Sequence, residues 1–586
     1  MRHLLITGLA VAVLCAAAAE ATTYYVDYAS GDDARAGTTR QAAWQHAPGD
    51  AQATAKAKAV KLQPGDVVKF KGGVVYRGMI EINTFGAEGK PITYDGNTAG
   101  DWGEGRAIID GSMPLNDLKR CQSAAEAFGN PNFGNIYWTT VPAGAHWKSL
   151  NVRQGLKPLA WSMDPNPSDP VFQERPSEYH PTDKHIPRND AKLQVEGLGN
   201  IGENSRRPLM AMFDGSRLSA IVHQMAEGAK VKVTLAKPVT VTAFGITPQK
   251  GYVHPKEVSF IADGKQVLRT TLAHDSDNSK EQRVKLDEPA MFKELVIHFH
   301  SAYQRPGGEY RHFGAVRHIA GYNAKGDNVL LADDRKTVLR NDAVFTQDDP
   351  DFYDNAFMAL YGSRNFIYYK RIIGFDPANN TIQTQVLEPS QRPYEKGGAF
   401  AIVNSPRFID MPGEYALILD PEEDGRHKLL VWPPNGKPDD MTCGRYHKGF
   451  QINAGHVIVD GFWVRKQGWG GSWGIRAQGN RTHATDVIIR NCKVSHLRGS
   501  NVGIFSYGVN YLLVDNCEMS ENAGHTKGMV LRNAHHIVAS RCKLHKNSST
   551  ALDYYAVDQG VVQDCLVTEN QGMHANGLTL DRKSTR

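Results

Sequence analysis

Five stretches near the C-terminal end decide the fold: His456-Val-Ile-Val-Asp-Gly-Phe462, Asp486-Val-Ile-Ile-Arg-Asn-Cys492, Tyr511-Leu-Leu-Val-Asp-Asn-Cys517, His536-Ile-Val-Ala-Ser-Arg-Cys542 and Gly560-Val-Val-Gln-Asp-Cys565. Their cysteines recur at intervals of 25, 25 and 23 residues. A second apolar stretch follows each of them: Gly474-Ile475, Gly503-Ile504, Gly528-Met529, Ala551-Leu552 and Gly577-Leu578. Two short strands in each repeat are typical of one coil of a parallel β-helix, in which each coil buries its apolar face against its neighbours.

The overall composition favours a turn-rich β protein. The 586 residues include 56 glycines, and no long stretch shows helical periodicity. The 67 Lys and Arg residues nearly balance the 62 Asp and Glu residues, so the formal net charge of +5 names no partner by itself. We predict a monomer with no nucleic-acid partner.

The N-terminus has the features of a secretory signal peptide. A basic start precedes an apolar stretch from Leu4 to Ala19, and Ala19-Glu20-Ala21 forms a small-x-small cleavage site. We therefore assign residues 1–21 to a signal peptide and expect a secreted protein, extracellular or periplasmic. No later stretch approaches the ~18 consecutive apolar residues of a membrane-spanning helix, so no membrane association is predicted.

The C-terminal residues 581–586 do not continue the repeats. They follow Gly577-Leu-Thr-Leu580 in mid-strand and resemble the translation of a common sequencing adapter. We expect these residues to be an artefact and further coils to be missing.

Residues 206–325 differ from the repeats, because their strands are longer and alternate more regularly. The pattern is carried by Met212-Phe-Asp-Gly215, Val231-Lys-Val-Thr-Leu235, Val239-Thr-Val-Thr-Ala-Phe-Gly-Ile246, Pro255-Lys-Glu-Val-Ser-Phe260 and Leu295-Val-Ile-His-Phe299. These stretches resemble the discoidin-like (coagulation factor 5/8 C-type) family, whose fold is a jelly-roll β-sandwich. The resemblance implies a domain that binds carbohydrate.

The flanking parts, residues 22–205 and 326–580, are assigned to one solenoid that the sandwich interrupts. Tyr24-Tyr-Val-Asp27 with Gly31-Asp-Asp33 resembles the opening strand of secreted, pectate-lyase-like β-helix proteins. Pro412-Gly-Glu-Tyr415 and Leu429-Leu-Val-Trp-Pro-Pro434 resemble a segment of large secreted β-helix proteins, several of which are glycoside hydrolases. The predicted fold class is all-β, a right-handed parallel β-helix with an inserted β-sandwich, and the resemblance implies activity on carbohydrate.

The second strand of each repeat predicts a functional surface. Side chains alternate between the two faces of a strand, so residues one and three positions after the inward apolar residue face solvent. We predict catalytic roles for Arg532, Asp553, His525 and Tyr555, and substrate-binding roles for Tyr507, Lys527, His574 and Asn576.

These residue types suit a sugar acid as ligand. Arg binds a carboxylate through two hydrogen bonds, aromatic rings pack on sugar faces, and His or Tyr transfers protons. Elimination at a uronic acid needs a cation and a base, which Arg532 with His525, Lys527 or Tyr555 would supply. Hydrolysis usually needs two carboxyl groups roughly 5 to 9.5 Å apart, and Asp553 has no acidic partner at the outward positions of neighbouring coils.

The stretch Gly528-Met-Val-Leu-Arg532 resembles the strand with the charge-neutralising Arg in the alginate lyase and chondroitinase B family. The catalytic Lys that this family places about one coil earlier has no counterpart between Tyr507 and Tyr511. We predict a polysaccharide lyase or glycoside hydrolase acting on an acidic extracellular polysaccharide; the alternative is a non-catalytic glycan-binding protein or adhesin. Calcium is common in both fold types, but no Asp/Asn loop has its ligand spacing, so no metal or cofactor is assigned.

Overall fold

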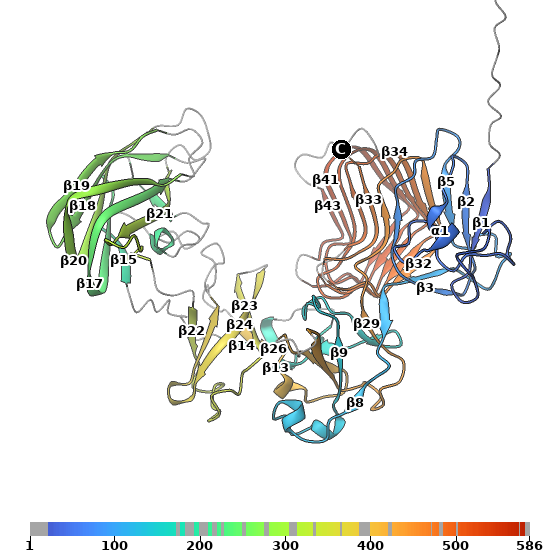
Figure 1. Ribbon diagram of the computed structural model, residues 1–586, viewed down its shortest axis with the longest axis horizontal. Helices are drawn as coiled ribbons and strands as arrows, with labels where there is room; N and C mark the ends of the chain where they lie inside the picture. Colours follow the sequence, from blue (N-terminus) through green and yellow to red (C-terminus); the bar gives the residue numbers. More distant parts are fainter. Residues whose placement is uncertain are drawn as a thin grey trace, which may run out of the picture.

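The computed structural model of the chain contains a solenoid, an annex of antiparallel sheets and a β-sandwich (Figure 1). It describes residues 21–171, 176–181, 193–198, 209–213, 220–223, 225, 228–248, 253–274, 280–303, 313–331, 336–363, 366–385, 399–419, 425–469, 471–479, 485–499, 502–572 and 575–580. The predicted signal peptide, except for Ala21, and the predicted adapter residues lie outside these ranges.

Each full coil of the solenoid contributes one strand to each of three parallel faces. The β33 face contains β4 (Ile80–Ile82), β30 (Lys448–Ile452), β33 (Trp473–Gln478), β36 (Val502–Tyr507), the first parts of β39 (Lys527–Ser540) and β41 (Leu552–Gln563), and β43 (Leu578–Leu580). The β34 face contains β1 (Thr23–Val26), β2 (Val67–Phe70), β5 (Ile92–Asp95), β31 (Val457–Asp460), β34 (Thr485–Arg490), β37 (Asn510–Asp515) and the second parts of β39 and β41. The β35 face contains β3 (Val75–Arg77), β6 (Ile108–Asp110), β32 (Trp463–Arg465), β35 (Lys493–Ser495), β38 (Glu518–Ser520), β40 (Lys543–His545) and β42 (Leu566–Thr568).

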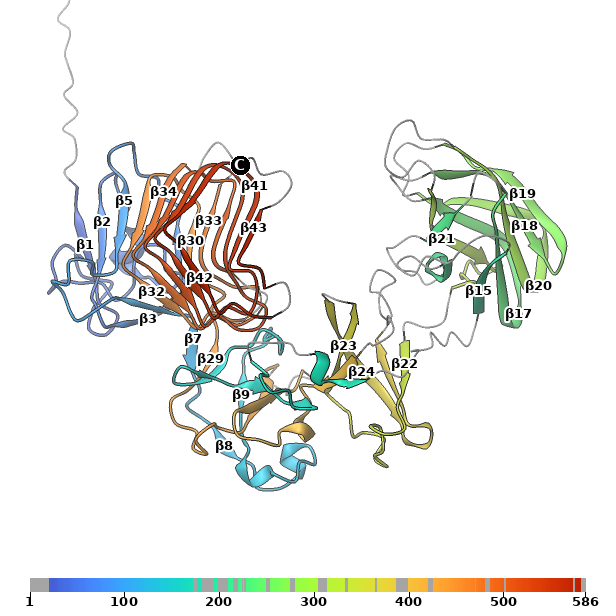
Figure 2. The same ribbon diagram turned by 180° about the vertical axis from the view of Figure 1, so that it is seen from behind.

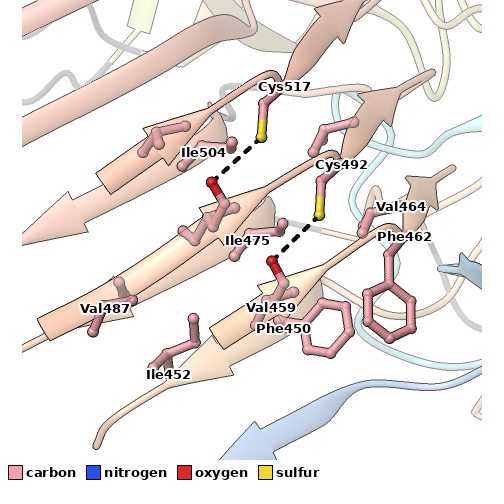
Figure 3. Close-up of a cluster of buried hydrophobic side chains, with 14 of the residues drawn as sticks. Phe450, Ile452, Val459, Phe462, Val464, Ile475, Val487, Cys492, Ile504 and Cys517 are labelled. Carbon is pink, nitrogen blue, oxygen red and sulfur yellow. Dashed lines mark hydrogen bonds between the residues drawn. The ribbon is translucent and has the colours of Figure 1, made fainter. Parts of the chain in front are cut away.

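The interior of the solenoid consists of stacked apolar side chains. Ile475 and Ile504 are fully buried, and the thiols of Cys492 and Cys517 lie in the same core (Figure 3). The Cys492 thiol donates to the Val459 carbonyl at 3.8 Å. Fully burying an aliphatic side chain of this size contributes about 1.5–3 kcal/mol relative to exposure, so each coil is stabilised by its neighbours. Of the regularly spaced cysteines, Cys492, Cys517 and Cys542 are buried in this core, and Cys565 packs against it partly buried.

The polypeptide chain leaves the solenoid after its first coils and re-enters it only in its C-terminal part. β30 pairs in parallel with β4, β31 with β5, and β32 with β6, although more than 350 residues separate the partners: Phe450 lies opposite Ile80, for example. The first coils therefore end near Ser112, and the solenoid resumes at Lys448. The predicted solenoid boundaries at residues 205 and 326 are thus wrong. Residues 112–181 and 336–444, on either side of the sandwich, were assigned to the solenoid, but their strands form separate, mainly antiparallel sheets.

These mainly antiparallel sheets form the annex. Its strands are β7 (Ser112–Pro114), β8 (Lys119–Arg120), β9 (Tyr137–Val141), β10 (Val152–Gln154), β11 (Lys157–Pro158), β12 (Ala160–Trp161), β13 (Met163–Asp164), β14 (His180–Pro181), β22 (Lys336–Arg340), β23 (Phe357–Ser363), β24 (Phe366–Asp376), β25 (Thr381–Gln385), β26 (Ala399–Val403), β27 (Glu414–Leu417), β28 (His427–Val431) and β29 (Met441–Gly444). Trp147, Trp161 and Tyr415 lie in its main core, so the annex has a hydrophobic centre of its own.

The sandwich is a curved antiparallel sheet that closes around one core. Its strands are β15 (Leu193–Leu198), β16 (Ala220–His223), β17 (Lys230–Pro248), β18 (His254–Ala262), β19 (Lys265–Thr271), β20 (Gln282–Tyr303) and β21 (Phe313–Tyr322). The two longest strands, β17 and β20, shift register between Thr234 and Val239, and such irregularities let a strand bend. Phe244 stacks on Phe260 inside this core, with ring centroids 4.1 Å apart.

The sandwich lies apart from the solenoid, and the annex adjoins the solenoid's lower end in both views (Figures 1 and 2). In the short helix α1 (Ala55–Ala59), Ala57 packs with Trp44 near the first coil. The prediction of an all-β chain with a parallel β-helix and an inserted β-sandwich is confirmed.

Candidate functional site

The β33 face carries two rows of outward side chains that cross the coils in register. Equivalent residues of adjacent strands lie about 4.8 Å apart. One row runs through Gln451, Arg476, Phe505, Val530, Asp553 and Thr579, and the other through Gln478, Tyr507, Arg532 and Tyr555. The alternate residues Ile504 and Met529 are fully buried, as predicted, but Gln451 and Val530 of the first row are also only 3% and 1% exposed, so the prediction that this row faces solvent is wrong there.

Lys527 and Arg532, both on β39, converge on Asp553 of the adjacent strand β41. Lys527 Nζ lies 2.8 Å from Asp553 Oδ2, and Arg532 Nη2 lies 3.4 Å from the same oxygen. Asp553 is only 7% exposed. The expectation of a solvent-facing carboxylate is therefore wrong, because two long cationic side chains reach across this short outward one.

Arg532 lies between two tyrosines on the neighbouring coils. Tyr507 and Tyr555 are its register partners on β36 and β41. Arg532 Cζ lies 5.5 Å from the centroid of the Tyr555 ring, within the range of cation–π attraction. The two tyrosines are 43% and 40% exposed. Arg532 Nε is buried and, among the described residues, has no hydrogen-bond partner.

The other predicted site residues lie at the margin of this group. His525 precedes β39 by two residues and has a left-handed backbone with φ of 69°. The Asn576 side chain donates to Thr579 Oγ1 at 3.4 Å on the last described coil. His574 lies outside the described residues. Five of the eight predicted residues form one group: Tyr507, Lys527, Arg532, Asp553 and Tyr555.

Two further residues of the same face, Trp473 and Arg476, were missed by the sequence analysis. Arg476 Cζ lies 4.4 Å from the Trp473 ring centroid and 5.7 Å from that of Phe505. The signal that identifies Arg476 is the inward position of Ile475, since alternation places the next residue outward. The predicted row of polar residues began one coil later, at Ile504, and so omitted it.

The arrangement of acidic groups limits the chemistry available here. The register neighbours of Asp553 are Val530 and Thr579, neither of which is acidic. In the parts of the chain that the structure covers, no three His, Cys, Asp or Glu residues are grouped so that they could hold a metal ion. The group around Asp553 therefore consists of two cations, Lys527 and Arg532, one carboxylate and two exposed tyrosines.

A protein-family model described as a right-handed beta helix region matches residues 465–585, which begin at the end of β32. The match includes β36, β39 and β41, which carry the ion-paired group, and it agrees with the three-faced solenoid. No curated protein sequence matches the chain. Within the described ranges, no helix is both long enough and apolar enough to cross a membrane.

Solved structures resemble the whole chain or a part of it. A glycoside hydrolase is 10% identical, and the match covers 94% of this chain and 80% of that one with a TM-score of 0.47. A family 32 carbohydrate-binding module from C. perfringens NanJ, in complex with galactose, is 20% identical over 23% of this chain and 95% of its own, with a TM-score of 0.18. The family 32 module of AlyQ, in complex with 4,5-unsaturated mannuronic acid, is 11% identical over 25% of this chain and 100% of its own, with a TM-score of 0.17.

Proposed function

We propose that this protein is secreted and degrades an acidic polysaccharide on the β33 face by elimination. The observation that carries the proposal is the convergence of Lys527 and Arg532 on one oxygen of Asp553, beside the exposed rings of Tyr507 and Tyr555. Clustered cations favour the binding of a sugar carboxylate, and neutralising its charge makes the adjacent C–H more acidic.

In the proposed step, Arg532 binds the carboxylate of a uronic acid unit and Lys527 adds a second positive charge. Tyr555 acts as the base and takes the proton from the carbon next to the carboxyl group. The electrons of that C–H bond form a C=C double bond, and the neighbouring glycosidic C–O bond breaks. Tyr507 donates a proton to the leaving oxygen. Asp553 acts as a positioning residue, because it holds both cations on the same side of the sheet.

Elimination fits this group better than hydrolysis does. Most glycoside hydrolases use two carboxyl groups, one as acid and one as base or nucleophile. Asp553 is already engaged by two cations, and no described register neighbour supplies a second carboxylate. Elimination needs neutralising cations and a proton acceptor, and this group contains both.

The test is to incubate the full chain with polygalacturonate, alginate and hyaluronan, and with neutral glycans, while following ultraviolet absorbance. Elimination creates an unsaturated product that absorbs, so absorbance is expected to rise with a uronic-acid glycan only. Arg532→Gln and Tyr555→Phe are each expected to slow the reaction by roughly 100-fold or more, since each removes a group that acts in the transition state.

Arg490→Gln is the matched control. Arg490 is on β34, on another face, and its Nε lies 2.6 Å from Asp460 Oδ2, so its loss should leave the rate unchanged. New reducing ends without absorbance would indicate hydrolysis instead. Unchanged rates in both Arg532→Gln and Tyr555→Phe would rule out the proposed site.

Glycan binding without cleavage is the second candidate, and the lack of a second carboxylate beside Asp553 on the neighbouring strands favours it. Retention of the chain on an immobilised acidic glycan, with no product from any substrate, would support binding over degradation. The secretion that we propose rests on residues 1–21 and predicts that the exported protein begins at Thr22, which N-terminal sequencing checks.

A further inference from the structure

The second feature of the β33 face is an aromatic and cationic cluster around Arg476, which we call the Arg476 cluster: Lys448, Trp473, Arg476 and Phe505. Lys448 is the register partner of Trp473, and Arg476 is that of Phe505. The Trp473 and Phe505 rings lie 6.0 Å apart at an interplanar angle of 49°, and the Arg476 guanidinium contacts both. These side chains lie on the same outward surface as Asp553.

The positive charge of this cluster has no ion pair within the part of the chain that is described. Arg476 Nε is buried and lacks a hydrogen-bond partner there. Burial lowers the pKa of the Arg476 guanidinium, and burial together with the charge of Arg476 lowers the pKa of Lys448, which Glu81 opposes. The sequence agrees, because residues 461–485 contain four Arg or Lys residues and no Asp or Glu.

A purely structural role does not account for this arrangement. An Arg that only packs on aromatic rings gains from the contact whether or not its polar atoms are covered. Covering Nε without a partner costs free energy, because a buried donor loses its bond to water. An anion bound at the accessible part of the guanidinium would offset the repulsion between Arg476 and Lys448.

We propose that the Arg476 cluster is a second subsite that binds the carboxylate of a uronic acid unit in the same glycan chain. The guanidinium would bind the carboxylate, and Trp473 and Phe505 would pack on the sugar face. β33 and β41 are three strand spacings apart, so this subsite lies about 14 Å from the Asp553 group along the solenoid. The inference rests on the proposed function in that both subsites share one acidic glycan.

The test measures the affinity of the full chain for oligogalacturonates of increasing length by calorimetry. The Tyr555→Phe variant serves as the background, because it slows cleavage while both cations of the Asp553 group remain. Adding Arg476→Gln is expected to weaken binding of oligosaccharides long enough to span both subsites about tenfold or more, and to leave the shortest ones unaffected. Lys448→Gln is expected to have a smaller effect of the same kind, and Arg490→Gln none.

The comparison of ligands defines the chemistry. Methyl-esterified oligogalacturonates are expected to lose the dependence on Arg476, because they carry no charge. Sulfated oligosaccharides that carry no carboxylate but bind as well as the uronic acids would overturn the assignment to carboxylate. Equal affinity of long oligogalacturonates for the Arg476→Gln variant and its background would overturn the inference alone. Failure of the native chain to bind any acidic glycan would overturn the proposed function as well.

Discussion

Glu414 shows what folding does to a single carboxyl group. Its side chain is only 3% exposed and accepts the backbone N–H groups of Asp410 and Met411 at 2.8 and 3.1 Å. Burial raises the pKa of Glu414 to about 8, from an ordinary value of 4.5. Between these two values the folded chain holds a proton that the unfolded chain releases, so the free energy of unfolding falls as the pH rises from about 4.5 to 8.

The prediction is that Glu414→Gln removes this pH dependence. Each unit of pKa difference corresponds to about 1.4 kcal/mol, so the difference in unfolding free energy between variant and native chain should change by several kcal/mol from pH 5 to pH 8. Urea unfolding at pH 5 and pH 8 measures the free energy of unfolding of both chains. The variant should become more stable relative to the native chain at pH 8. A difference that does not vary with pH would contradict the assignment.

At the same scale, the sequence predicted side-chain direction better than exposure. Alternation placed Tyr507 and Arg532 outward correctly, because a strand offers only two faces. It could not show that Asp553 is covered, since that depends on how Lys527 and Arg532 fold over it. The same rule would have placed Arg476 outward, because it follows the inward Ile475. That its Nε has no partner among the described residues cannot be predicted from alternation.

At the scale of the element, close stacking of the coils depends on small residues where a strand begins. A Cβ atom on Gly503 would lie 2.6 Å from the Gly528 carbonyl oxygen and 2.9 Å from Met519 Cγ. The equivalent position in later coils holds Ala551 and Gly577, and a Cβ on Gly577 would meet nothing closer than 3.6 Å.

Gly503→Ala is therefore expected to destabilise the solenoid by about 1–3 kcal/mol, the usual cost of forcing extra atoms into a packed interior. Gly577→Ala, the matched control, should be nearly neutral. Urea unfolding followed by circular dichroism measures both. Equal stability of the two variants would show that the coils are less tightly stacked than described.

The repeat predicted the strands of the solenoid because each coil reuses one pattern of apolar residues. The annex has no such repeat, and most of its strands pair antiparallel over long sequence separations, as β9 does with β28. Local pattern does not specify such pairing. The resemblance of Pro412–Tyr415 to β-helix proteins therefore suggested a coil, whereas Glu414 and Tyr415 lie in β27 of the annex.

At the scale of the whole molecule, Asn151 joins the annex to the solenoid. Its buried amide donates to the carbonyls of Gln467 and His496 at 3.2 and 2.7 Å, and its oxygen accepts from Arg153 Nε at 2.8 Å. Asn151→Ala removes the bonds to the His496 carbonyl and to Arg153 Nε, at a cost of about 1–3 kcal/mol for each, whereas the Gln467 carbonyl keeps the Arg498 N–H at 3.2 Å.

We expect Asn151→Ala to separate the thermal unfolding of the annex from that of the solenoid, so that calorimetry shows the annex melting earlier. Asn166→Ala is the control, because that exposed amide bonds only Asp410 within the annex. A variant that melts in step with the control would show that the two parts are coupled by other contacts.

The central claim is that the β33 face binds an acidic glycan, and hydroxyl-radical footprinting of the full chain with and without oligogalacturonate tests it most directly. Tyr507 and Tyr555 are exposed on this face, so their rings are oxidised readily in the free chain. We predict that the glycan protects Tyr507, Tyr555 and Trp473 from oxidation and leaves the exposed Tyr511 unprotected. Protection confined to the sandwich, with these three rings oxidised as before, would contradict the claim.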